Sequence, residues 1–258
     1  SGTVALISDD TVDALYGERV AHGLEQAGFA VCRFAFPHGE ASKNLETYGA
    51  ILRFLAENQL SRSDTLAALG GGVAGDMAGF AAATYLRGLR LVQMPTTLLA
   101  AVDSSVGGKT AVDLPMGKNL VGAFCQPSLV LCDPHVLSTL PDPIFYDGCA
   151  EVIKAAMLKS HTFFEDLDKT PPREQLEHIL EFCIAMKRDV VAMRGMRRSW
   201  CPSASNRSPA PENLLMVPRP SATSTMPWAP MISMIMRQRP KETGRWESRW
   251  IMDIPVPV

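Results

Sequence analysis

The chain has 258 residues, of which 47% are hydrophobic and 20% charged, and its formal net charge at pH 7 is −2. This length suits one large or two modest domains, and the near-zero charge excludes a general attraction to nucleic acid or acidic membranes. We find no signal peptide and no apolar run of the ~20 residues that span a bilayer. The six cysteines are scattered and form no CxxC pair, so we expect a cytoplasmic protein with reduced thiols.

Short apolar runs alternate with helical periodicity in the region before Pro141. We predict strands at residues 4–7, 29–36, 65–69, 89–94 and 129–132, and helices at 11–27, between 40 and about 58, and from about 75 onward. Gly28 and Pro95 each end one of these elements. Strands that alternate with helices form βαβ units. We therefore expect an α/β domain over residues 1–143 with a doubly wound, Rossmann-like parallel sheet.

The predicted strands stop at Pro141. Residues 147–160 and 173–191 have helical spacing, which indicates the start of an all-α domain over residues 144–192. Composition changes again afterwards, because residues 193–258 hold ten of the nineteen prolines and eight of the thirteen methionines. Proline at this density interrupts helices. We expect residues 193–258 to be an aberrant tail, either disordered or the product of a shifted reading frame, which leaves the all-α domain incomplete.

A glycine-rich turn lies between a predicted strand and a predicted helix. Residues 70–75 are GGGVAG and satisfy GxGxxG, a pattern that lets phosphates approach a helix N-terminus. Asp76 follows near the helix start, where the helix dipole favours an acid. No acidic residue closes a second strand about 20 residues later, so the dinucleotide fingerprint is incomplete. A nucleotide site and a tight structural turn both stay open here.

A second glycine-rich segment is Gly107-Gly108-Lys109-Thr110. A P-loop requires glycine at position 103, and the chain has Asp103 there, which argues against a P-loop NTPase. Lysine after two glycines still suits an anion, because its ammonium is a compact point charge. The alternative is a surface hairpin.

Charged residues also occur on the two predicted helices of the all-α region. Glu151 and Lys154 lie three residues apart on a helix that we expect to be mostly buried. Such a pair is either an ion pair or a carboxylate that binds a metal. Lys187 lies on the apolar stripe of its helix, and its spacing favours a side chain that snorkels to solvent over one that points into a cleft.

Taken together, four segments resemble the 3-dehydroquinate synthase family of the shikimate pathway. They are HGEASKNLET, ALGGGVAGDMAGFAAATYLRG, PTTLLAAVDSSVGGKTAVDLPMGKNLVGAF and AEVIKAAM, and the similar region covers about residues 4–191. Cyclases of sugar phosphates share this pattern more loosely. Glycerol-dehydrogenase-like enzymes share only the fold and a glycine turn.

The resemblance implies an NAD site across the parallel sheet and a substrate site beside it. The residues implied at the NAD site are Asp9, Glu40, Ala41, Ser42, Lys43, Gly72, Val73, Ala74, Gly75, Asp76, Thr96, Thr97, Lys118, Val136, Leu137, Ser138 and Thr139. Those implied at the substrate site are Arg87, Lys109 and Asn119 for its anionic groups, and Asp103, Lys154 and Lys187 for its hydroxyls. Glu151 is implied as one ligand of a catalytic Zn²⁺ or Co²⁺.

The implied reaction converts 3-deoxy-arabino-heptulosonate 7-phosphate to 3-dehydroquinate with loss of phosphate. NAD oxidises one alcohol and later returns the hydride, while the metal polarises the oxygen that is oxidised. The resemblance also implies a homodimer that acts on a small sugar phosphate, with no nucleic-acid or membrane partner.

The chain departs from the family after about residue 191. The family supplies two zinc-binding histidines there, whereas this chain has no histidine after His178. Of the three expected ligands only Glu151 is present, and one carboxylate does not hold catalytic Zn²⁺. Three hypotheses follow: a 3-dehydroquinate synthase, an inactive NAD-binding remnant, and a related sugar-phosphate cyclase or NAD-dependent polyol dehydrogenase. We also expect apolar surface on residues 147–191 to stay exposed.

Overall fold

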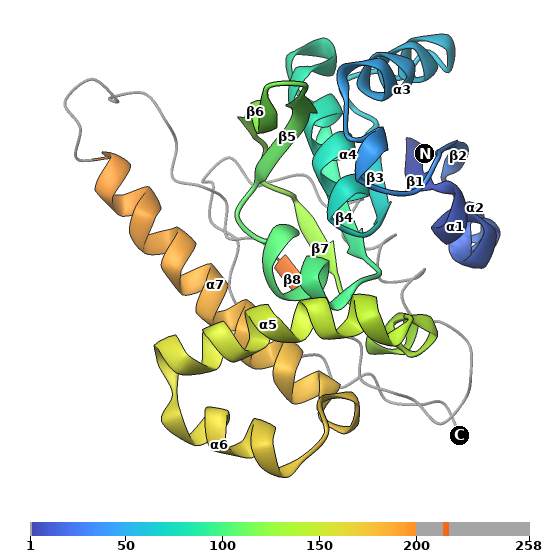
Figure 1. Cartoon of the computed structure of the whole chain (residues 1–258). Helices are drawn as coiled ribbons and strands as arrows, with labels where there is room; N and C mark the ends of the chain where they lie inside the picture. Colours follow the sequence, from blue (N-terminus) through green and yellow to red (C-terminus); the bar gives the residue numbers. More distant parts are fainter. Residues whose placement is uncertain (1, 200–213, 217–258) are drawn as a thin grey trace.

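The computed structural model describes residues 2–199 and 214–216. Figure 1 shows a sheet flanked by helices, with a separate group of helices, α5 to α7, at one end of it. The remaining residues, which include most of the predicted tail, lie outside the described part of the chain.

Six parallel strands form one sheet in the order β2-β1-β3-β4-β7-β8. They are β1 (Thr3–Asp9), β2 (Ala30–Phe36), β3 (Thr65–Gly70), β4 (Arg90–Pro95), β7 (Leu129–Leu131) and β8 (Leu214–Met216). Every residue of β3 is buried, as expected for a strand covered on both faces. The chain runs from β1 to β2 on one side and then to β3 on the other, so the strand order reverses beside β1. This confirms the doubly wound sheet, whose ligands bind at the carboxyl ends of the strands near that reversal.

Helices follow most strands, as the sequence predicts. The α-helices are α1 (Asp10–Val12), α2 (Glu18–Gln26), α3 (Leu45–Glu57), α4 (Gly72–Thr84), α5 (Asp142–Lys159), α6 (His161–Lys169) and α7 (Leu176–Ser199). The shorter helical turns are η1 (Asp13–Gly17), η2 (Glu40–Ser42), η3 (Tyr85–Arg87), η4 (Ala100–Ser104), η5 (Pro134–Thr139) and η6 (Pro172–Glu174).

Two hydrophobic clusters cover the opposite faces of the sheet, because successive side chains of a strand point to opposite sides. Val4 and Leu6 of β1 belong to the cluster that includes α2 and helices α5 to α7. Ala5 and Ile7 belong to the cluster formed with α3 and α4. The helical region therefore shares its core with one face of the α/β domain.

An antiparallel hairpin, which we did not predict as an element, packs against α4. Its strands are β5 (Lys109–Leu114) and β6 (Gly117–Phe124). Gly107 and Gly108, with φ of +110° and +66°, lead the chain into β5, so the segment forms a hairpin, whether or not Lys109 also binds an anion. A Cβ atom at Gly79 of α4 would lie 2.3 Å from Cγ2 of Thr110. The hairpin can approach the helix this closely only because residue 79 is glycine.

Residues 142–199 are mainly helical, and α5 begins at Asp142, five residues before the predicted helix at 147–160. The expected change at residue 192 falls inside α7, which continues to Ser199, and Leu214–Met216 adds β8 to the sheet edge beside β7. Of the predicted tail, the structure describes only residues 193–199, in α7, and 214–216, in β8. Within the described ranges, no helix has the length and apolar character needed to cross a membrane.

Helix α5 is not mostly buried, and that prediction is wrong. Val152 and Ala156 lie in the core, but Ile153, Met157 and Leu158 are 44%, 73% and 68% exposed. The apolar residues of this helix encircle it instead of forming one stripe, and the described residues cover only one side. The expected apolar surface on residues 147–191 is thus present.

Replacing Gly79 with alanine tests whether glycine sets the distance between the hairpin and α4. The added methyl group would overlap Thr110 and displace the hairpin, so we expect the free energy of unfolding to fall by about 1–3 kcal/mol. Gly49→Ala on α3 is the matched control, since its Cβ would meet only the end of Arg53 at 3.8 Å. That change should stabilise the helix by about 0.5–1 kcal/mol. Equal effects of the two substitutions in urea titrations would contradict the packing argument.

Candidate active site

The glycine turn after β3 leads into the N-terminus of α4 at the carboxyl edge of the sheet. Gly70 has a φ of +154°, Gly71 is the N-cap, and no side chain caps the helix. The first N–H groups of a helix have no acceptor within it, so this end favours an anion. A Cβ on Gly71 would lie 3.1 Å from Thr97, and one on Gly72 would lie 3.4 Å from Ser104 Oγ. The glycine turn, Thr97 and the η4 turn therefore lie close together at the N-terminus of α4.

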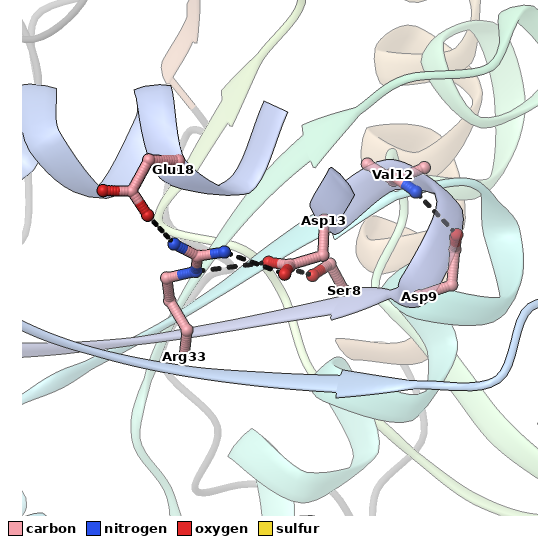
Figure 2. A network of polar contacts seen from close by, with 6 residues as sticks. All are labelled: Ser8, Asp9, Val12, Asp13, Glu18 and Arg33. Carbon is pink, nitrogen blue, oxygen red and sulfur yellow. Dashed lines mark hydrogen bonds and ion pairs between the residues drawn. The ribbon is translucent and has the colours of Figure 1, made fainter. Parts of the chain in front are cut away.

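Asp9 lies at the adjacent strand end but serves partly as a helix cap. Its Oδ1 accepts a hydrogen bond from the N–H of Val12 at 2.9 Å, and its Oδ2 would lie 3.5 Å from a Cβ on Gly70. Figure 2 shows that Asp9 points away from the neighbouring network of Asp13 and Arg33. In that network Arg33 pairs with Asp13 at 2.8 Å, which fastens β2 to the η1 turn. We assign the Arg33 network to the fold and Asp9 to the edge of the site.

A buried lysine joins the predicted cofactor residues to the hairpin. Lys43 Nζ lies 2.6 Å from Asp76 Oδ2 and 2.6 Å from Asn119 Oδ1, and its side chain is 7% exposed. Burial raises the pKa of the Asp76 carboxyl above its usual value, and the Lys43 ammonium opposes that shift. Beside them, Lys118 Nζ lies 2.9 Å from Glu40 on the exposed surface. The structure thus brings residues 40–43, Asp76 and residues 118–119 together.

A narrow pocket lies at the carboxyl ends of β3, β4 and β7. Thr96 and Val136, both predicted, line it together with Tyr16 and Asp133, which the sequence analysis missed. The Tyr16 hydroxyl donates to the Val136 carbonyl at 3.2 Å and lies 2.5 Å from Thr139 Oγ1. It thereby fixes the turn that carries residues 136–139. No motif marks Tyr16, because its partners lie 120 and 123 residues further along the chain.

The other residues predicted near the cofactor have mixed surroundings. Leu137 and Ser42 are buried, and Ser42 Oγ donates to the Pro37 carbonyl at 2.5 Å. Ala41 and Ser138 are exposed, and Ser138 Oγ donates to the His135 carbonyl at 2.7 Å. The side chains of Leu137 and Ser42 therefore help to hold the two turns in shape.

A third group lies where α5 and α7 meet the η4 turn. Lys187 of α7 forms an ion pair with Asp103 of η4, and both side chains are mostly covered. The expectation that Lys187 snorkels to solvent is therefore wrong, because its partner comes from a segment 84 residues away. Lys109 follows the same loop at the start of β5 and is exposed. Asp103 and Lys187 thus meet where η4 packs against α7.

Glu151 and Lys154 form a local ion pair on α5, with Lys154 Nζ 2.8 Å from Glu151 Oε2. Burial raises the pKa of the neighbouring Cys183 thiol to about 12, so that thiol stays protonated at neutral pH. No group of three His, Cys, Asp or Glu side chains in the described ranges could hold a metal ion. The residues present around Glu151 therefore do not fit a catalytic zinc site.

Arg87 lies apart from all these residues within one chain. It follows the C-terminal end of α4 and precedes Arg90, which pairs with Thr65 at the amino end of β3. The N-terminus of α4 and the glycine turn are at the opposite edge of the sheet. Leu86 and Arg87 both have positive φ, 51° and 67°, which is a strained conformation for non-glycine residues.

The fold and these segments can be compared with known proteins. A family model described as 3-dehydroquinate synthase N-terminal matches residues 33–147. In this region the chain belongs to the 3-dehydroquinate synthase family. The 3-dehydroquinate synthase of Streptococcus suis (strain 05ZYH33) is 47% identical over 193 residues, which cover 73% of this chain and 54% of the relative. The chain thus spans about half the length of the curated relatives it matches.

Two solved structures of related synthases are similar in fold. A 2-deoxy-scyllo-inosose synthase complexed with carbaglucose-6-phosphate, NAD⁺ and Co²⁺ is 32% identical, with a TM-score of 0.67 over 73% of this chain and 54% of its own. The 2-epi-5-epi-valiolone synthase of Streptomyces hygroscopicus subsp. jinggangensis 5008, with NAD⁺ and Zn²⁺ bound, is 27% identical. Its TM-score is 0.65, over 80% of this chain and 59% of its own.

Replacing Arg87 with glycine tests whether the positive φ of residue 87 strains the backbone. Relief of the positive φ gains about 1–2 kcal/mol, and the greater freedom of glycine in the unfolded chain costs about 0.4–1 kcal/mol. We therefore expect a small rise in the free energy of unfolding, measured by urea titration. Arg53→Gly, inside α3, should instead cost about 1 kcal/mol. A fall in the free energy of unfolding of Arg87→Gly would contradict the strained conformation of residue 87.

Proposed function

We propose that this chain carries the NAD-binding half of a 3-dehydroquinate synthase. The observation that carries the proposal is the uncapped, glycine-rich N-terminus of α4 at the point where the strand order reverses. Gly71 and Gly72 carry no Cβ, so the pyrophosphate of a dinucleotide would be able to approach the backbone N–H groups of this helix end closely. The NAD⁺ named in the structure of the 32% identical synthase supports the same assignment.

The substrate would lie beside the cofactor, between the η4 turn, the hairpin and helices α5 and α7. Lys109 is an exposed cation that would bind an anionic group of a sugar acid phosphate. Lys154, which pairs with Glu151, would contact one of its hydroxyls. Asp103 would accept hydrogen bonds from the hydroxyls of the substrate, and Lys187 would donate hydrogen bonds to them. NAD, when bound, supplies reversible hydride transfer, and the protein supplies orientation. The substrate of the whole enzyme would be 3-deoxy-arabino-heptulosonate 7-phosphate, which forms 3-dehydroquinate and phosphate.

The residues that the structure describes do not provide a complete metal site. Glu151 contacts Lys154, and no second and third ligand lie nearby within the described ranges. No step of the reaction is therefore assigned to a metal in this chain. We propose that the chain binds NAD and does not turn over the heptulosonate phosphate, which corresponds to the inactive-remnant hypothesis.

A titration with NAD⁺ tests the cofactor site. Gly72→Asp would place a negative charge where the pyrophosphate meets the helix N-terminus, and we expect at least about a tenfold rise in the dissociation constant. Gly72→Ala is the matched control, because its Cβ would make only ordinary contact with Ser104 Oγ at 3.4 Å. It should bind NAD⁺ more tightly than the aspartate variant. Undiminished binding by Gly72→Asp would show that NAD lies elsewhere.

A second candidate function is that of a related sugar-phosphate cyclase, and the 32% identity to 2-deoxy-scyllo-inosose synthase favours it over a polyol dehydrogenase. Phosphate release separates the candidates when the purified chain is given NAD⁺, Zn²⁺ and the heptulosonate phosphate or a hexose 6-phosphate. We expect no phosphate from either. Release only from the hexose phosphate would favour the cyclase. Accumulation of free NADH with a polyol would favour the dehydrogenase.

A further inference from the structure

The hairpin strand β5 has an irregularity that turns one backbone group out of its ladder. The register of β5 and β6 shifts between Val112 and Leu114, so Asp113 stands outside the regular pairing. Its N–H donates instead to the Lys43 carbonyl at 2.8 Å. A bulge of this kind redirects a residue toward a new partner. The partner here is the turn that follows η2.

The opposite strand has a matching distortion at Asn119, whose φ is +57°. Asparagine tolerates this left-handed conformation better than most residues. The Asn119 N–H donates to Asp113 Oδ1 at 2.7 Å, and its side-chain Oδ1 accepts from Lys43 Nζ at 2.6 Å. Both distortions of the hairpin therefore bring polar groups to Lys43.

The Lys43 ammonium has little capacity left for a ligand. An ammonium has three donor hydrogens, and two are directed at Asn119 and at Asp76 of α4. The side chain is 7% exposed and that of Asp76 is 18% exposed. Because both charges are largely buried, each depends on the other for stabilisation. Lys43 thus connects the η2 turn, the α4 helix and the hairpin through a single atom.

We infer that Lys43 is a positioning residue that couples the cofactor-binding helix to the substrate side of the hairpin. The inference rests on the proposed function, since it takes NAD to bind at α4 and the substrate to lie near Asn119. Cofactor binding at the N-terminus of α4 stabilises the helix that holds Asp76. Asp76 and Lys43 then hold the amide of Asn119 in place.

Hydrogen exchange of the hairpin amides tests the connection without any cofactor. In Lys43→Met combined with Asp76→Asn, no buried charge is left unpaired, so the fold is kept while the tie to Asn119 is lost. We expect the amides of residues 109–124 to exchange about tenfold faster than in the native chain. Asn119→Gly keeps the positive φ and removes the side-chain amide, so it should show the same change. Lys169→Met, which breaks an exposed ion pair with Asp166, should leave the hairpin unaffected. Unchanged exchange in both hairpin variants overturns the inference.

A second measurement adds NAD⁺ and reports the coupling itself. In the native chain NAD⁺ should slow exchange across residues 109–124, and in Asn119→Gly it should still bind, with a dissociation constant within about tenfold, but should no longer slow that exchange. Full protection of the hairpin by NAD⁺ in Asn119→Gly contradicts the coupling. If the native chain does not bind NAD⁺, the proposed function fails, while the cofactor-free exchange still decides whether Lys43 ties the three segments.

Discussion

Helix α4 is approached closely on two sides, and glycine makes both approaches sterically feasible. A Cβ at Gly75 would lie 2.9 Å from Gln93 Oε1 of β4, and a Cβ at Gly79 would lie 2.3 Å from Thr110 of β5. Gln93 is buried and donates to the Gly75 carbonyl at 3.2 Å, which links the helix to the sheet by a polar contact as well. The rest of the site depends on this packing. The N-terminus of this helix lies at the edge of the sheet. The helix also carries Asp76, which Lys43 links to Asn119 of the hairpin.

Five of the six strands of the parallel sheet were predictable, because they are short apolar runs, several of them bounded by glycine or proline, whereas β8 lies in the predicted tail. Thr65–Gly70 is an example, since it is buried throughout and the glycine turn ends it. The glycine-rich motif also marked a helix N-terminus, although α4 begins at Gly72 and not at about residue 75. The hairpin was only one of two alternatives for the segment around Lys109. Strand β6 has no buried residue and contains Gly117 and Gly122, so the sequence gives only a weak strand signal there. Its stability comes from α4, a contact that the local sequence does not encode.

The site residues that sequence reasoning placed wrongly or missed depend on contacts between distant segments. The partner of Lys187 is Asp103, on a turn between two strands, so helical spacing alone favoured solvent. Tyr16 contacts a turn more than a hundred residues away, and nothing around it in the sequence marks that role. The burial of α5 was overestimated because Met157 and Leu158 look like core residues, but the described chain supplies nothing to cover them.

The two halves of the proposed site differ in completeness. The cofactor side has the N-terminus of α4, the glycine turn before it and the buried Lys43–Asp76 ion pair, which holds α4 against the η2 turn. The metal side has Glu151, which is paired with Lys154. The most direct test is to measure NAD⁺ binding and zinc content on one preparation of the chain equilibrated with both. The account predicts saturable binding of NAD⁺ and zinc far below one ion per chain. One zinc ion per chain, lost on Glu151→Gln, would contradict it.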